Sequence, residues 1–377
     1  MLLKKIFIIS AVIMVFISIF SGIYFLVFKK SPEKIIKNEP IKEKSFESLE
    51  TVSLKIASMT SGTVISAAVN IKDGSIYYYS NLDGTLWNIT ERGTNATKIS
   101  DEKLLNIKSI DWSNDSQLAI ITFSDGHIVI NNHQTGEQIN LKENIDSAGW
   151  SNINDKIIYK YFDENKKERS LNSANLDGSN WKKIVNLDFR HVSFQSIPHS
   201  IQIAFWSKPD SSSITKLFKT NITSLSEPQK IFGDKFGADF LFSPDGSKFI
   251  VSYVNEEGGQ KMNLGIANSQ GEEFQDLQIP TLIQKVVWSK DSKTIYYAQP
   301  SGVSDGSVMP NDYLNKKFVT QDTFWKMEIA TGKKERLVKL EELIEQLDAT
   351  NLFLSKTEDA LFFINRANGL LYRLSMD

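Results

Sequence analysis

The sequence contains no cysteine among its 377 residues. Disulfide bonds, thiolate nucleophiles and cysteine-ligated metal or redox centres are therefore excluded. An excess of one charge sign is also missing, because 43 lysines and arginines are balanced by 45 aspartates and glutamates, for a net charge of −2. This balance gives no electrostatic reason to expect nucleic-acid binding. The hydrophobic fraction of 41% is that of an ordinary globular chain, so we expect packing to provide the stability.

The short motifs of common enzyme classes are absent as well. The sequence has no G-x-S-x-G, G-x-x-x-x-G-K-[ST], H-E-x-x-H or G-x-G-x-x-G pattern and no D-x-D-x-D-G calcium loop. Of the four histidines, only His127 and His133 could lie in the same blade and bind a metal ion together. We favour the alternative, that they form no metal site. We therefore predict no cofactor, no metal and no catalytic residue, and a binding protein is favoured over an enzyme.

One long stretch near the N-terminus carries no charge. Ile6–Phe28 contains 23 residues (28 − 6 + 1) and is flanked by two lysines on each side. At ~1.5 Å per residue it would cover ~35 Å, enough for a hydrocarbon core of ~30 Å. A cleaved signal peptide is the alternative, but its apolar region is normally only ~7 to 15 residues long. We predict a cytoplasmic tail and an uncleaved transmembrane signal anchor within residues 1–30.

The flanking lysines do not decide the orientation of this segment, because they are equal in number on the two sides. A short tail before a single apolar segment behaves like an export signal, so we expect a cytoplasmic N-terminus and an extracytoplasmic C-terminal domain at the cell membrane. Residues 31–48 are rich in Lys, Glu and Pro, which is typical of a solvated linker. Residues 49–377 then form the folded domain.

A repeated pattern fills that domain. Three strict copies read W-S-N-D at 112–115, F-S-P-D-G at 242–246 and W-S-K-D at 288–291, and a strand-like run follows each. With looser copies, the anchor positions are 69, 112, 150, 194, 242, 288 and 354. Their spacing is close to the ~40 to 50 residues of a four-stranded propeller blade.

The repeats predict an all-β fold. We expect a β-propeller of about seven four-stranded blades, with six or eight as alternatives, preceded by one transmembrane helix. The last repeat holds only three strands, whereas Thr51–Ala57 forms an extra strand before the first anchor. We therefore expect that segment to complete the last blade and close the ring; a disordered leader is the alternative.

The repeated units resemble the TolB-like and Trp-Asp-like propeller repeats of bacterial envelope proteins. The resemblance covers about residues 50–377 and is carried by Phe242–Gly246, Trp288–Asp291 and Asn175–Gly178. It implies the fold but no function, since propellers carry unrelated activities. TolB-like propellers commonly have six blades and no anchor, so a role in the Tol system is not implied. We interpret the repeated tryptophans as core and the repeated aspartates as turn residues.

The sixth repeat contains an insertion between its second and third strands, Pro300–Asp322. It is much longer than the ~2 to 5 residues of a simple hairpin. Glu341–Leu347, predicted as a short helix, should lie on the same face. Long loops on rigid scaffolds often bind partners, whereas a solvated loop is the alternative. The candidate binding residues of the insertion are Asp305, Asp312, Tyr313 and Phe318.

Two functions follow from these observations. The first is a membrane-tethered, extracytoplasmic scaffold that binds a protein, peptide or glycan of the cell envelope. The alternative is a hydrolase or lyase centred on the propeller channel, with acidic residues contributed by several blades.

Overall fold

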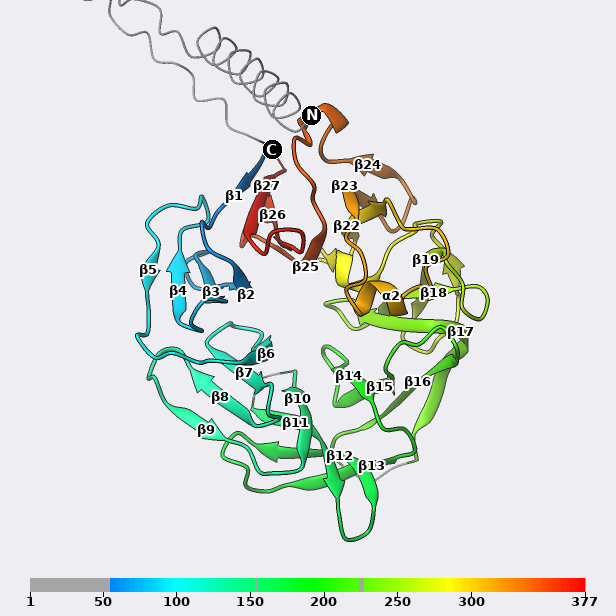
Figure 1. The fold of residues 1–377 in the computed structure, drawn as a ribbon. Coiled ribbons are helices and arrows are strands. Elements are labelled where there is room, and N and C mark those ends of the chain that lie inside the picture. The colour runs from blue at the N-terminus through cyan, green and yellow to red at the C-terminus, as the bar shows by residue number, and fades with distance from the viewer. Residues whose placement is uncertain (1–54, 153–154, 224–226, 377) are drawn as a thin grey trace, which may run out of the picture. The chain divides into compact units, whose positions relative to one another are not determined.

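The computed structural model describes residues 55–152, 155–223 and 227–376. This part of the chain forms six antiparallel sheets, five of four strands and one of seven. Figure 1 shows the sheets following one another around a common centre. No helix in these three ranges is long and apolar enough to cross a membrane. The predicted span Ile6–Phe28 and the predicted linker lie outside the described residues.

Three of the four-stranded sheets are built from consecutive strands in the first half of the domain. Their strands are β2 (Val64–Val69), β3 (Ile76–Ser80), β4 (Leu86–Ile89) and β5 (Thr97–Lys98); β6 (Ile107–Trp112), β7 (Leu118–Phe123), β8 (Ile128–Asn132) and β9 (Gln138–Asn140); β10 (Ile145–Trp150), β11 (Lys156–Asp163), β12 (Glu168–Asn175) and β13 (Lys182–Leu187).

The second half contains the remaining sheets. The seven-stranded sheet has β14 (Val192–Ser196), β15 (Gln202–Ser207), β16 (Ile214–Asn221), β17 (Gln229–Phe242), β18 (Lys248–Val254), β19 (Met262–Asn268) and β20 (Gln275–Asp276). The next sheet has β21 (Val286–Trp288), β22 (Thr294–Ser301), β23 (Gln321–Glu328) and β24 (Lys334–Arg336). The short helix η1 (Ile283–Lys285) precedes it, and α2 (Asn311–Leu314) lies between β22 and β23. The last sheet has β25 (Ala349–Leu354), β26 (Ala360–Asn365), β27 (Leu371–Ser375) and β1 (Ile56–Ser58), and the short helix η2 (Leu340–Glu342) precedes β25.

The seven-stranded sheet consists of two blades that share β17. The first part of β17 pairs with β16, and its second part pairs with β18. The chain bends between them at Gly237, whose φ of 56° is unfavourable for residues with a side chain. A Cβ there would also lie 2.7 Å from Pro310 Cδ. Divided at β17, the described residues form 5 + 2 = 7 blades.

The ring closes with an N-terminal strand, as the sequence predicts, although of the predicted segment Thr51–Ala57 only residues 55–57 are among the described residues. β1, the first strand of the described chain, pairs with β27, the last one, in the register Ile56 to Leu374 and Ser58 to Tyr372. The N–H of Ser375 also donates to the carbonyl oxygen of Lys55, at 2.9 Å. An N-terminal strand thus completes the last blade, and Figure 1 shows β1 beside β27.

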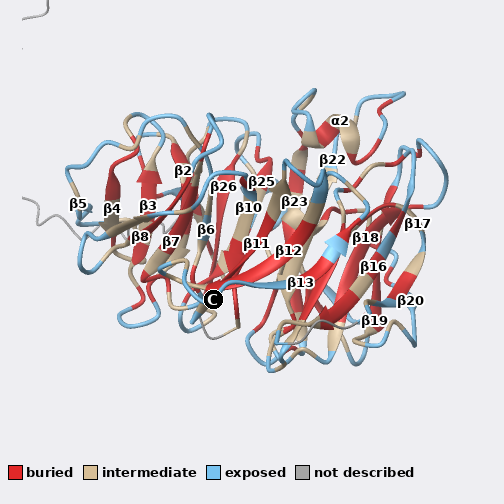
Figure 2. Cartoon of the chain, turned by 90° about the horizontal axis from the view of Figure 1, so that it is seen from below, coloured by how far each residue is buried: buried red, intermediate tan, exposed pale blue. Residues whose placement is uncertain are grey.

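The repeated aromatic residues lie at the ends of the innermost strands. Trp150, Phe242 and Trp288 are buried, which confirms that these rings belong to the core. Figure 2 shows the buried residues concentrated in the strands, while the exposed residues lie mainly in the connecting turns. Packing between successive twisted sheets therefore uses the anchors that define the repeat.

The strands alternate in direction, so each blade has two kinds of connection. Turns from the first to the second strand emerge on one side of the ring, which we call face 1; it carries the turns at 113–117 and 243–247. Turns from the second to the third strand emerge on the opposite side, face 2, which carries the insertion. Because β22 and β23 extend to Ser301 and Gln321, the insertion itself comprises residues 302–320.

The prediction of a helix at Glu341–Leu347 is wrong. The structure has a single turn of 3₁₀ helix at Leu340–Glu342. The carboxylate of Glu342 accepts the N–H of Lys339 at 2.9 Å and closes this turn after three residues. Leu347 is buried whereas Ile344 is 78% exposed, so the rest of the segment crosses from the outer to the innermost strand as an irregular connection.

Candidate functional site

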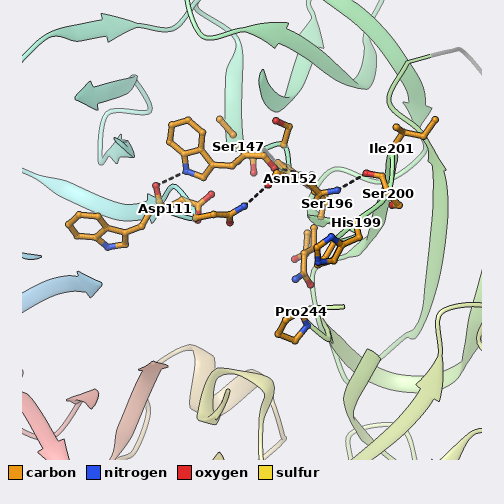
Figure 3. A pocket seen from close by; sticks show the side chains of 18 of the residues that line it. Asp111, Ser147, Asn152, Ser196, His199, Ser200, Ile201 and Pro244 are labelled. Atoms are coloured by element: carbon orange, nitrogen blue, oxygen red, sulfur yellow. Dashed lines mark hydrogen bonds between the residues drawn. The ribbon is translucent and has the colours of Figure 1, made fainter. Parts of the chain in front are cut away.

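A cavity of about 1140 Å³ opens on face 1, between the second, third and fourth blades. Its wall is formed by the ends of the innermost strands β6, β10 and β14 and by the turns that follow them. Figure 3 shows the side chains of these strands and turns around the cavity. Polar and aromatic side chains alternate along the wall, among them Asp111, Trp112, Asn152, Phe194, Gln195 and His199.

Hydrogen bonds between the turns hold the rim of this pocket. The side-chain amide of Asn114, in the second blade, donates to the carbonyl oxygen of Asn152 in the third blade, at 2.7 Å. Asn152 in turn donates to the carbonyl oxygens of Ile197 and Ser200 in the fourth blade, at 2.6 and 2.7 Å. Three blades are thus linked in series, so the pocket is formed before any ligand arrives.

The aspartates of the repeated turns serve structure, as the sequence predicts. Asp115 accepts the hydroxyl of Ser113 at 2.7 Å, and Asp291 accepts that of Ser289 at 2.6 Å. In the turn of Asp245, partial burial opposes ionisation, but hydrogen bonds from neighbouring serines lower the pKa of that carboxyl to about 2. These side chains are occupied by their own turns and are not free for a ligand.

The neighbouring residue Asp111 is different. Its carbonyl oxygen accepts the indole N–H of Trp150 at 3.0 Å, but its carboxylate has no hydrogen bond or ion pair within the described ranges. The side chain is open to the channel. Asp111 is exposed, but the protein around the channel still reduces the hydration of its carboxyl and raises its pKa to about 7. The carboxylate is thus held toward the pocket without a partner.

The carboxylate lies above a glycine of the next blade. A Cβ added to Gly149 would be 3.3 Å from Asp111 Oδ2 and 3.0 Å from the ring of Phe194. Gly149 therefore leaves the space into which the carboxylate of one blade and the aromatic ring of another converge. Any larger residue at this position would fill that space.

Two tryptophans complete the aromatic part of the wall. The N–H of Trp112 donates to the hydroxyl of Ser66 at 2.8 Å, and that of Trp150 is used by the carbonyl oxygen of Asp111. Both indole N–H groups therefore have partners. Trp150 is buried, and the ring of Trp112 packs against Tyr79 and His133, with centroids 5.5 and 5.1 Å away. Trp112 and Phe194 are both partly exposed.

The residues predicted from the sequence as binding residues lie elsewhere, in the insertion on face 2. Tyr313 is 1% exposed, and its hydroxyl donates to Asp348 Oδ1 at 2.7 Å. Phe318 is partly buried and packs against the ring of Tyr313, with 6.0 Å between centroids. These two aromatic residues therefore hold the insertion against the blades.

The two predicted acidic residues have different surroundings. Asp312 accepts the N–H of Val308 at 2.9 Å and forms an ion pair with Lys317 at 2.7 Å. Its carboxylate is therefore used within the insertion. Asp305 is exposed, so of the four predicted residues it has the most accessible carboxylate. Binding by these residues stays a prediction.

The insertion contacts three neighbouring blades. The side-chain oxygen of Asn311 accepts the N–H of Ser211 in the fourth blade at 3.0 Å. The N–H of Met309 donates to Gly259 O in the fifth blade at 3.0 Å. The hydroxyl of Tyr313 donates to Asp348 in the seventh blade, at 2.7 Å. The insertion is a packed part of the ring rather than a solvated loop.

A buried ionic cluster joins the sixth and seventh blades. Lys285, Asp322 and Asp348 are each 0% exposed, and Lys285 Nζ lies 2.5 Å from Asp322 Oδ2 and 2.7 Å from Asp348 Oδ1. Burial raises the pKa of Asp322, and Lys285 offsets part of this effect. For Asp348 burial acts in the same direction, but the cation of Lys285 helps to outweigh it, and the pKa is lowered.

Sequence reasoning missed Asp111, Gly149 and Phe194 as a group. One signal was present for Asp111: it directly precedes the aromatic anchor Trp112, whereas Leu241 and Val287 occupy that position in the other strict copies. A carboxylate where the repeat has an apolar residue indicates a local function. Nothing in the sequence indicated which residues of other blades it would meet.

Comparisons with known proteins identify the fold. No family model matches this sequence, and no curated protein matches it. The structure of an oligogalacturonate lyase in complex with manganese is similar, with a TM-score of 0.60, 11% identity, and coverage of 85% of this chain and 93% of that one. The β-propeller domain of Cps50 (Swd1) from Myceliophteria thermophila has a TM-score of 0.55, 9% identity, and coverages of 85% and 100%.

TolB from Acinetobacter baumannii is also similar, with a TM-score of 0.48, 12% identity, and coverages of 74% of this chain and 64% of that one. The first two likenesses confirm the predicted propeller fold, and at these identities they show the fold alone. In the described part of the present chain, no group of three or more histidine and acidic side chains could hold a metal ion.

Proposed function

We propose that this chain is a membrane-tethered, extracytoplasmic β-propeller whose face 1 pocket binds a component of the cell envelope. The observation that carries this proposal is the free carboxylate of Asp111 in a cavity of about 1140 Å³. This carboxylate is exposed, so a ligand can reach it, and an acidic group with a raised pKa in a cavity is typical of a functional site.

The pocket needs little reordering to accept a ligand. Its rim is fixed by the hydrogen bonds of Asn114 and Asn152, and Trp150 in its wall is buried. Because a preformed site avoids much of the entropic cost of ordering loops, more of the contact energy is available for affinity.

The sequence supports the location of this activity. Ile6–Phe28 is long enough for one membrane span, and residues 31–48 have the composition of a solvated linker. A linker of this kind could extend to roughly 60 Å. The propeller would then bind envelope components within reach of the membrane surface.

The positions of the acidic side chains favour a binding function over a hydrolase or lyase. Among the described residues that line the pocket, Asp111 contributes the acidic side chain. Asp239, on the innermost part of β17, lines a different cavity, and its carboxylate accepts the indole N–H of Trp206 at 2.9 Å. A hydrolase or lyase that uses two acidic residues needs both at one substrate, and these two carboxylates do not line a common cavity.

The experiment that tests the proposal is affinity capture from native envelope extracts with a blocked pocket. We expect Asn114→Trp, which places a large ring at the exposed rim, to abolish capture of the main ligand. Asn315→Trp is the matched control, because Asn315 is exposed on face 2. Capture that survives Asn114→Trp, in a variant with an unchanged melting temperature, would place the binding surface outside the pocket.

A further inference from the structure

The charge around Asp111 indicates what the pocket can bind. Reduced hydration of the Asp111 carboxyl accounts for its raised pKa without a contribution from any neighbouring charge. Residues 153 and 154, which are not described, are Ile and Asn and carry no charge either. The protein therefore places one negative charge in the pocket and offers no cation in the described chain to neutralise it.

An aromatic ring lies next to this carboxylate. Phe194 and the carboxylate converge above Gly149, whereas the ring of Trp112 lies against Tyr79 and His133. The faces of aromatic rings attract cations, and a carboxylate forms its strongest hydrogen bonds with charged N–H donors. An ammonium or guanidinium group is the ligand chemistry that uses both features together, whereas a neutral hydroxyl would leave the charge unbalanced.

We propose that the face 1 pocket binds the basic side chain of a peptide, with its cationic group paired to Asp111 beside the ring of Phe194. This inference rests on the proposed function of the pocket as a binding site. A volume of about 1140 Å³ exceeds what a single ammonium group fills, so the neighbouring residues of an extended peptide also find room. Peptide groups can hydrogen-bond with the serine and amide side chains of the wall.

Binding of this kind depends on pH in a defined direction. The carboxyl of Asp111 must be ionised, so affinity for a basic peptide should rise as the pH increases through about 7. The other titratable groups on β6, β10 and β14 and in the turns that follow them are Lys108, Asp115, Asp146, Asp155 and His199, of which His199 lines the pocket. Asp146 is paired with Lys160 at 2.6 Å, and Asp115 is held by its turn.

The test titrates the purified full chain with two blocked peptides, acetyl-Lys-Lys-Lys-amide and acetyl-Gln-Gln-Gln-amide, followed by tryptophan fluorescence. We expect saturable binding of the lysine peptide with a dissociation constant below about 1 mM at about pH 8, and at least roughly 10-fold weaker binding of the glutamine peptide. Asp111→Asn should weaken lysine-peptide binding by at least about 10-fold and remove its pH dependence. Glu164→Gln, which changes an exposed carboxylate in the turn between β11 and β12 on face 2, should change neither.

Three results would overturn the inference: no saturation by the lysine peptide in the wild type, equal affinity for the two peptides, or equal binding by wild type and Asp111→Asn. An equal loss caused by Glu164→Gln would mean that the charge effect does not depend on the pocket. The proposed function of the pocket as a binding site is tested separately from its preference for a cation. If envelope capture is abolished by Asn114→Trp but unaffected by Asp111→Asn, the pocket remains a binding site and only its preference for a cation is wrong.

Discussion

Replacing Lys285 with methionine is expected to lower the free energy of unfolding by about 3–5 kcal/mol, because it leaves the buried carboxylate of Asp322 without its cation and leaves Asp348 paired with Arg366 alone, at 3.3 Å. Lys285 pairs with Asp322 and Asp348, and all three side chains are fully buried. Its ammonium group also donates to the carbonyl oxygen of Ala349 at 2.9 Å. Denaturant unfolding of the wild type and the variant measures the difference.

Lys326→Met is the matched control for this substitution. Lys326 also pairs with a carboxylate, Glu335, at 3.4 Å, but both side chains are at least one third exposed. An exposed pair of this kind contributes only about 0–1 kcal/mol. Equal effects of the two substitutions would mean that the buried cluster contributes no more than a surface ion pair, which would contradict its proposed role in joining the sixth and seventh blades.

Deleting residues 45–58 is expected to destabilise the entire ring, because the last blade loses β1. That strand pairs with β27 over Ile56–Ser58, and Ile56 packs against the core of the last blade. A loss of about 2–3 kcal/mol would lower the melting temperature of a domain of this size by roughly 3–5 °C, and the uncovered edge of β27 should promote aggregation. Thermal unfolding with light scattering follows both effects.

Deletion of residues 31–44 is the control, since it removes the same number of residues from the predicted linker and leaves β1 in place. It should leave the melting temperature unchanged. If the two deletion variants have the same melting temperature, the pairing of β1 with β27 does not hold the ring closed. Closure must then depend on packing between the blades.

The blade framework was predictable because it is local. Each W-S-x-D turn lies within a few residues of its anchor, and period-2 patterns mark the strands on either side. Even closure could be predicted, since a three-strand last repeat and an extra N-terminal strand complement each other. These features recur in the sequence, so each copy supports the others.

The pocket and the buried cluster were not predictable in this way, because they form between blades. Asp111, Gly149 and Phe194 come from three successive blades, and their meeting depends on the twist and spacing of the sheets. The contacts of the insertion were not predictable either. Tyr313 was predicted as a binding residue, but its hydroxyl donates a hydrogen bond to Asp348 in the next blade. A single sequence gives no signal for such contacts unless a residue departs from its repeat, as Asp111 does.

The most direct test of a binding site on face 1 is photo-crosslinking in intact cells, with the reactive residue placed on either face of the ring. Ile201, at the rim of the pocket, is 57% exposed, and Val308, in the insertion, is 36% exposed, so both positions can carry the probe. We predict a specific crosslinked product from position 201 that disappears with Asn114→Trp, and none from position 308. A product from position 308 alone would contradict the account and place the binding surface on the insertion.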